Sequence, residues 1–151
     1  MRKIFLLFVF GGMFFSPLAA QNNDKTHFGY AELGSIGGYP AIGGGYRTQV
    51  GYHGFDISGK FFPLIPIPAA EIRGLYLFYP QQKGIYFGSG LGFIREGETL
   101  RHGSLSFDAV IGYQWKMAKG RDLFFQVEGI TPFKKTCCSP IWPAISIGIG
   151  F

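Results

Sequence analysis

Histidine combined with serine and aspartate is the set of side chains used in nucleophilic acyl transfer and hydrolysis. Two stretches of the sequence contain part of this set: His102 with Ser104, Ser106 and Asp108, and His53 with Asp56. In a β-strand, successive residues on one face lie about 6.6 Å apart. This distance is too long for direct hydrogen bonds along one strand. We therefore interpret these residues as polar filler on one face, and an enzyme remains the alternative.

Two adjacent cysteines, Cys137 and Cys138, are the other reactive side chains. A disulfide between neighbours closes a strained ring that usually requires a cis peptide bond. In an oxidising compartment, a disulfide to an envelope partner is one interpretation, and a pair of thiols without a role is the other. Adjacent cysteines do not have the spacing of metal ligands. The sequence also contains no HExxH, P-loop or GxSxG motif, so we predict no metal, cofactor or catalytic site.

The N-terminus predicts export. Arg2 and Lys3 precede an apolar run over residues 4–15, and small residues lead to Ala20. This pattern is typical of a signal peptide (1–20), because the run falls short of the ~20 apolar residues that a spanning helix needs. Cleavage after Ala20 leaves one domain, 21–151, whose net charge falls from +5 to +3 because only Arg2 and Lys3 are lost. The remaining basic residues are scattered, so nucleic-acid binding is not expected.

The composition is unusual for a soluble domain. Aromatic residues make up 18% of the chain and charged residues only 15%, beside 24 glycines. Soluble domains carry roughly a quarter charged residues, and disordered chains lack so much apolar surface. No second apolar stretch approaches the length of a spanning helix, so any entry of the mature chain into a membrane must use strands.

Apolar residues recur with period two between glycines and prolines, which predicts strands rather than helices. Eight strands are expected, near residues 27–36, 41–49, 52–62, 70–79, 84–94, 104–115, 121–131 and 144–151. The fourth alternates less cleanly, because Leu75 and Leu77 share parity with Glu71 and Arg73. Short turns near 50, 80 and 119 alternate with longer connections, which is typical of an up-and-down antiparallel meander.

The more polar face of these strands is rich in Gly, Ser and Gln and carries about one charge per strand, which suits the interior of a narrow barrel. We predict a charge network in that lumen formed by Glu32, Arg47, Asp56, Lys60, Glu71, Arg73, Asp108 and Glu128. The apolar face would then meet lipid, and closure would pair every strand edge. Candidates for aromatic girdles at its two borders are Tyr46, Tyr79, Tyr113, Trp115, Phe133 and Trp142.

The final strand, PAISIGIGF, alternates and ends in Phe151. With the signal peptide and the eight segments, it resembles the small outer-membrane β-barrels of the OmpA/OmpX type in Gram-negative bacteria. The resemblance implies an all-β, eight-stranded antiparallel transmembrane barrel in the outer membrane, in contact with its lipids and lipopolysaccharide. It also implies that Phe151 is the signal read by the outer-membrane assembly machinery.

We therefore expect a non-enzymatic, integral outer-membrane barrel with a plugged lumen and a structural or surface-presenting role in the cell envelope. Two alternatives remain. Some small outer-membrane barrels modify lipid A as acyltransferases or deacylases, and a porin-like narrow channel would require an open lumen.

Overall fold

The computed structural model describes residues 25–63, 68–82, 84–96, 102–117, 121–133 and 141–151. The predicted signal peptide (1–20) and the pair Cys137 and Cys138 lie outside these residues. Within the described ranges no helix is long and apolar enough to cross a bilayer.

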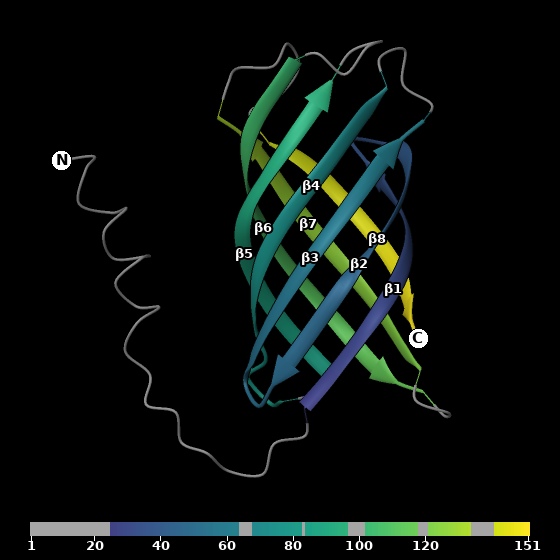
Figure 1. Ribbon diagram of the computed structural model, residues 1–151, viewed down its shortest axis with the longest axis vertical. Coiled ribbons are helices and arrows are strands. Elements are labelled where there is room, and N and C mark those ends of the chain that lie inside the picture. Colours follow the sequence, from purple (N-terminus) through teal and green to yellow (C-terminus); the bar gives the residue numbers. More distant parts are fainter. Residues whose placement is uncertain (1–24, 64–67, 83, 97–101, 118–120, 134–140) are drawn as a thin grey trace, which may run out of the picture.

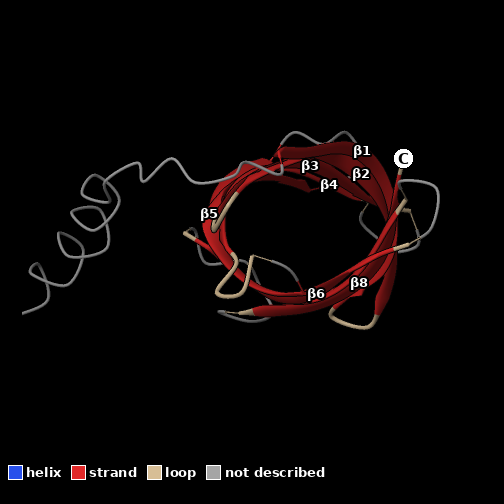
Figure 2. Ribbon diagram, turned by 90° about the horizontal axis from the view of Figure 1, so that it is seen from below, coloured by secondary structure: helices blue, strands red, loops and turns tan. Residues whose placement is uncertain are grey.

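The described residues form eight strands, as the period-two pattern predicts, and the strand bounds differ from the expected ones by a few residues. They are β1 (Lys25–Ile36), β2 (Tyr39–Val50), β3 (His53–Phe62), β4 (Ala69–Phe78), β5 (Gly84–Glu96), β6 (His102–Lys116), β7 (Asp122–Pro132) and β8 (Trp142–Gly150). Each strand pairs antiparallel with the next, and β1 pairs with β8 to close the barrel. Figure 2 shows the closed ring of strands along the barrel axis. Closure pairs every strand edge with a neighbour.

The barrel has two distinct ends (Figure 1). We call the end where β1, β3, β5 and β7 finish the loop end, and the end where they begin the turn end. At the loop end, β1 joins β2 through Gly37 and Gly38, whose φ angles are 56° and 91°. Positive φ at both positions suits the primed hairpin turns that match the strand twist, and glycine adopts it without steric cost. The local sequence therefore sets this hairpin.

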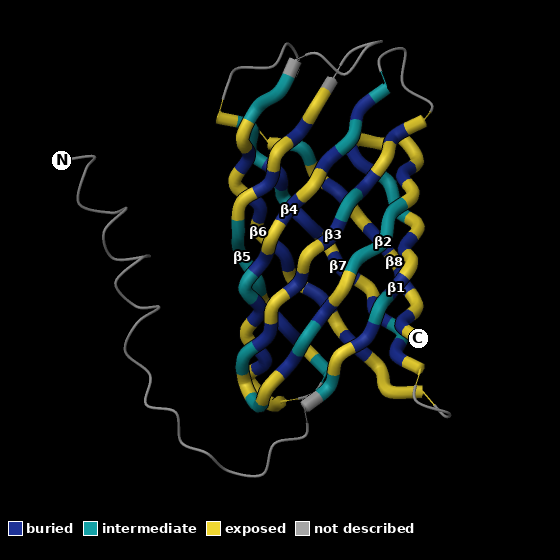
Figure 3. Tube along the Cα trace, in the orientation of Figure 1, coloured by how far each residue is buried: buried dark blue, intermediate teal, exposed yellow. Residues whose placement is uncertain are grey.

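Inward and outward residues alternate along every strand (Figure 3). The outward face is apolar and exposed, with a band of large aliphatic side chains that includes Leu33, Ile57, Ile72, Leu91, Ile111 and Ile147. The inward face holds the buried polar and charged residues. The barrel is therefore inverted relative to a water-soluble one, in which the apolar face points inward.

The fourth strand resolves its ambiguity by parity, because Leu75 and Leu77 point inward together with Glu71 and Arg73 and are 2% and 0% exposed. Two expectations about the aromatic girdles need correction. Tyr79 is also buried in the lumen, and Trp142 packs against a buried cluster at the loop end, so neither belongs to an outer aromatic girdle. The reason is the same in each case: the lumen must be filled along its whole length, and only part of that filling is polar.

The closest approach of two strands requires a glycine at position 90. A Cβ on Gly90 would overlap the backbone carbonyl of Gly74, whereas a Cβ on outward-facing Gly74 would meet nothing within 4 Å. We expect Gly90→Ala to lower the free energy of unfolding by about 1–3 kcal/mol, as overpacking does, and Gly74→Ala to change it much less. Urea unfolding of both variants in one detergent is the measurement. Equal stabilities would contradict the close approach.

Candidate functional site

The lumen is filled in three layers. Near the loop end lies an apolar layer formed by Ile36, Ala41, Phe62, Ala69, Ile94, Ile130 and Ala144. Toward the turn end lies a layer rich in aromatic rings, formed by Phe28, Tyr30, Leu75, Leu77, Tyr79, Tyr86, Val110 and Phe124. Apart from Asp122 at the start of β7, the buried charged side chains lie between these two layers. The charged layer is therefore enclosed by apolar side chains on both sides.

Arg47, which is completely buried, is the centre of one half of the charged layer. Its Nε donates to Oδ2 of Asp56 at 2.8 Å, and its Nη2 donates to Oε1 of Gln126 at 3.1 Å. The hydroxyl of Tyr30 donates to the same Asp56 carboxylate at 2.9 Å. A charge-assisted pair with this many hydrogen bonds offsets much of the cost of burying both ions.

Aromatic rings also surround the Arg47 guanidinium. Its Cζ atom lies 4.5 Å from the ring centroid of Phe124, 4.7 Å from that of Tyr86 and 5.5 Å from that of Tyr30. At these distances the ring faces attract a cation, most strongly where water is excluded. Arg47 therefore joins the charged layer to the aromatic layer below it.

Glu128 is the centre of the other half. Its carboxylate accepts hydrogen bonds from Lys60 Nζ at 2.5 Å, from Arg73 Nη1, from Gln126 Nε2 at 2.8 Å and from Ser146 Oγ at 2.9 Å. Gln126 therefore links the two halves, because its oxygen accepts from Arg47 and its nitrogen donates to Glu128. The result is one continuous network across β2, β3, β4, β7 and β8.

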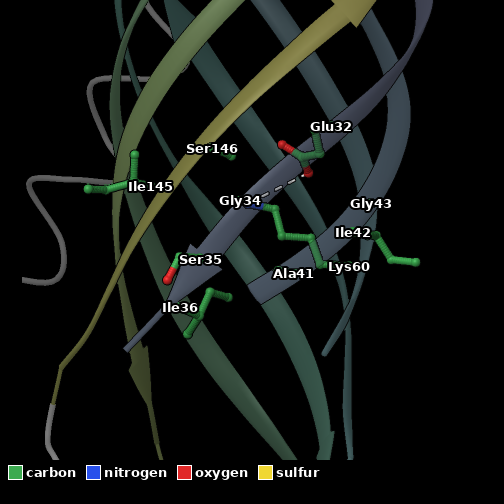
Figure 4. A pocket seen from close by; sticks show the side chains of 10 residues that line it. All are labelled: Glu32, Gly34, Ser35, Ile36, Ala41, Ile42, Gly43, Lys60, Ile145 and Ser146. Carbon is green, nitrogen blue, oxygen red and sulfur yellow. Dashed lines mark ion pairs between the residues drawn. The ribbon is translucent and has the colours of Figure 1, made fainter. Parts of the chain in front are cut away.

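Glu32 extends this network on the β1 side. Its Oε1 lies 3.6 Å from Nζ of Lys60, the ion pair drawn in Figure 4. Gly43 makes room for the pair, because a Cβ there would lie 3.0 Å from both Glu32 Oε1 and Lys60 Cγ. The cavity beside them, lined also by Gly34 and Ser146, has no room for a water molecule. This part of the lumen is closely packed.

All eight charges predicted for the lumen are buried there, but they do not all pair. Glu71 and Asp108 make no ion pair with a described residue, and their carboxylate oxygens have no hydrogen-bond partner. The ion pairs of the predicted network therefore do not include one between Asp108 and Arg47, Lys60 or Arg73. The stagger of the barrel directs those cations toward Asp56 and Glu128 instead.

Sequence reasoning missed Gln126 and the hydroxyls of Tyr30 and Tyr86 as members of the network. Gln126 shares parity with Glu128 on β7, so its inward direction could have been inferred. Its partners could not, because Arg47 lies 79 residues away in the chain. Tyr86 donates to Gln126 at 2.6 Å from a strand whose other inward residues are mostly glycines.

The turn end of the lumen opens into a cleft of about 420 Å³ lined by Gln49, Tyr79, Gln114, Trp115 and Lys116, among others. Tyr79 donates to Oε1 of Gln114 at 3.1 Å. Burial raises the pKa of the Tyr79 phenol above its usual value, so the hydroxyl keeps its proton. The cleft ends on this buried ring.

His53 is not placed for acyl transfer. His53 faces outward, and its Nδ1 lies 2.5 Å from the hydroxyl of Tyr76. Ser106 and Asp108 face the lumen on the opposite side of the wall, and the side chain of His102 lies outside the description. In the described part of the chain, no three His, Cys, Asp or Glu side chains gather into a site for a metal ion.

These features define the class: a closed eight-stranded antiparallel β-barrel with an apolar outer face and a filled, charged lumen. No protein-family model and no curated protein matches the sequence. Solved structures do share its fold. The N-terminal β-barrel domain of OprF from Pseudomonas aeruginosa superposes with a TM-score of 0.60 at 14% identity, over 87% of this chain and all of that domain.

Two further structures are similar. Neisserial surface protein A gives a TM-score of 0.56 at 13% identity, over 86% of this chain and 98% of the other. A de novo designed transmembrane β-barrel gives 0.55 at 14% identity, over 87% and 97%. At these identities the likeness concerns the fold, which is that of small transmembrane β-barrels.

Proposed function

We propose that this chain is an integral outer-membrane β-barrel protein with a plugged lumen and a structural or surface-presenting role in the cell envelope. The observation that carries the proposal is the inverted distribution of polarity. Large apolar side chains cover the outward face, and three cations and six carboxylates are buried inside. A bilayer stabilises such a wall, and water does not. Its partners would be outer-membrane lipids, lipopolysaccharide and the assembly machinery.

The filled lumen argues against a channel. The charged layer carries a continuous hydrogen-bonded network between two apolar layers, and an ion would have to displace both. We expect the purified protein to give no steady single-channel current in a planar lipid bilayer under conditions in which a porin control conducts. Reproducible current steps of one size would contradict the plugged lumen and favour the channel alternative.

An enzyme that modifies lipid A is the other alternative, and the described geometry gives it no support. Such a mechanism needs a base within hydrogen-bond reach of its nucleophile. The contact of His53 is a tyrosine hydroxyl on the outer face, and the barrel wall separates it from Ser106 and Asp108.

Phe151 provides a test of the outer-membrane assignment. Its side chain is 74% exposed beside Gly29, and its N–H donates to the Gly29 carbonyl at 2.9 Å. Because little of the ring is buried, we expect Phe151→Ala to refold in detergent almost as well as the unchanged protein. In cells, however, its outer-membrane yield should fall strongly, because the assembly machinery would no longer find the terminal aromatic.

The matched control is Phe151→Tyr, which retains an aromatic ring and should assemble normally. Heat-modifiable gel mobility of outer-membrane fractions measures assembly, and the same assay on refolded protein measures folding. An undiminished outer-membrane yield of Phe151→Ala would show that this residue is not the assembly signal.

A further inference from the structure

The charges buried in the lumen do not balance. The three buried cations Arg47, Lys60 and Arg73 are matched by ion pairs to Asp56, Glu32 and Glu128. Asp122, near the turn end, accepts a hydrogen bond from Gln114. Glu71 and Asp108 remain, 2% and 0% exposed, without an ion pair to any described residue. A buried carboxylate without a partner is costly, so this pair is neutralised either by bound protons or by a cation.

Five unpaired oxygen atoms gather at this pair. Both carboxylate oxygens of Glu71, both of Asp108 and the hydroxyl of Ser106 are buried without a hydrogen-bond partner. Ser106 is completely buried, and it is not an acidic residue, so it is an observation independent of the carboxylates. The Ser106 hydroxyl can both donate and accept, and the four carboxylate oxygens only accept when they are ionised. Oxygens of these kinds are ligands for a hard cation.

Gly92 makes the space into which these oxygens point. A Cβ built on Gly92 would lie 2.5 Å from Oγ of Ser106, 2.7 Å from Oδ2 of Asp108 and 3.1 Å from Oε1 of Glu71. Three oxygens from β4 and β6 therefore converge on one point above β5. Gly92 pairs with Arg73 on β4 and with Ser106 on β6, while Glu71 lies two residues before Arg73 and Asp108 two residues after Ser106.

We propose that Glu71, Asp108 and Ser106 form a binding site for one hard divalent cation, with Ca²⁺ as the best match. Two carboxylates supply the charge of −2 that such an ion neutralises. Ca²⁺ accepts six to eight oxygens in flexible geometry, whereas Mg²⁺ demands a near-ideal octahedron. The third protein ligand would be the Ser106 hydroxyl. The site is therefore not one of the clusters of three acidic, histidine or cysteine side chains that are absent from the described part of the chain.

Arg73 is the neighbouring cation that could have taken this role. Its Nε donates to Oγ of Ser58 at 2.9 Å and its Nη1 donates to Glu128, while its Nη2 has no hydrogen-bond partner, so no nitrogen of Arg73 is bonded to Glu71 or Asp108. The ion would thus neutralise the two carboxylates of the charged layer to which no described side-chain cation is bonded. Because the site is enclosed, the ion would enter during folding and exchange slowly afterwards.

The test is to refold the full mature chain in detergent free of lipopolysaccharide, with Ca²⁺ or with a chelator. After desalting, we expect about one Ca²⁺ per chain by mass spectrometry of the metal content. Ca²⁺ at 100 times its dissociation constant should raise the folding equilibrium constant about 100-fold, measured by urea unfolding. Glu71→Gln combined with Asp108→Asn should abolish both effects.

The control variant is Asp122→Asn, which removes a lumen carboxylate outside the site and should retain both effects. If the double variant does not refold, Gly92→Ala decides, because it keeps both carboxylates but fills the space between them and should lose the bound Ca²⁺. The proposal is overturned if the unchanged protein holds no Ca²⁺ and unfolds identically with and without it, as a pair neutralised by protons would. Equal loss in Asp122→Asn would also overturn it.

Discussion

Replacing Arg47 with alanine is expected to lower the free energy of unfolding by about 3–5 kcal/mol. The change removes the only described cation bonded to Asp56 and leaves that carboxylate buried with the Tyr30 hydroxyl as its donor. It also empties the space between the rings of Tyr86 and Phe124. Urea unfolding in detergent or lipid vesicles, extrapolated linearly to water, measures the loss.

Two variants separate the causes of this loss. Arg95→Ala removes an arginine that lies 5.9 Å from the Phe93 ring on the exposed face, and it should cost less than about 1 kcal/mol. Arg47→Met combined with Asp56→Leu removes both charges of the buried pair and should cost less than Arg47→Ala alone, because no ion is left unpaired. If Arg47→Ala cost no more than Arg95→Ala, Arg47 would not be the centre of the plug.

Arginine at outward positions in the middle of β6 should also destabilise strongly. Phe107 and Ile111 point outward and are 39% and 49% exposed to the surroundings of the barrel. If those surroundings are hydrocarbon, Phe107→Arg and Ile111→Arg should each cost about 2–4 kcal/mol in lipid vesicles. Trp115→Arg, on the same face but near the turn end, should cost about 0–1 kcal/mol because the charge can reach the interface.

Cysteine labelling gives an independent measurement of the same orientation. In a background without Cys137 and Cys138, cysteines at 107 and 111 should react with a lipid-soluble reagent and resist a water-soluble one. A cysteine at 108 should resist both, because Asp108 is completely buried. Two results together would mean that the apolar face is not in lipid. A cysteine at 108 would react readily with the water-soluble reagent, and Phe107→Arg and Ile111→Arg would leave the free energy of unfolding unchanged.

The number and order of the strands follow from local sequence. Period-two alternation is a property of extended backbone, and glycine pairs such as Gly37 and Gly38 place turns where positive φ is needed. Parity along a strand also assigns faces, so the inward direction of Glu32, Asp56 or Glu128 could be predicted without a structure. Parity was right at Leu75, Leu77 and Tyr79 as well, but hydrophobicity was a wrong guide there, because apolar side chains fill part of the lumen.

What only the tertiary structure decided is which inward side chains meet. Closure of β1 onto β8 and the stagger between strands set the height of each residue in the lumen, and no local pattern encodes that height. Arg47 therefore meets Gln126, far away in sequence, while Asp108 meets no cation and lies beside Glu71 over Gly92. The sequence alone predicts eight strands whose charged residues share the inner face of the barrel. The pairing of those charges comes from the geometry of the closed barrel, because contacts across a lumen depend on the whole circumference.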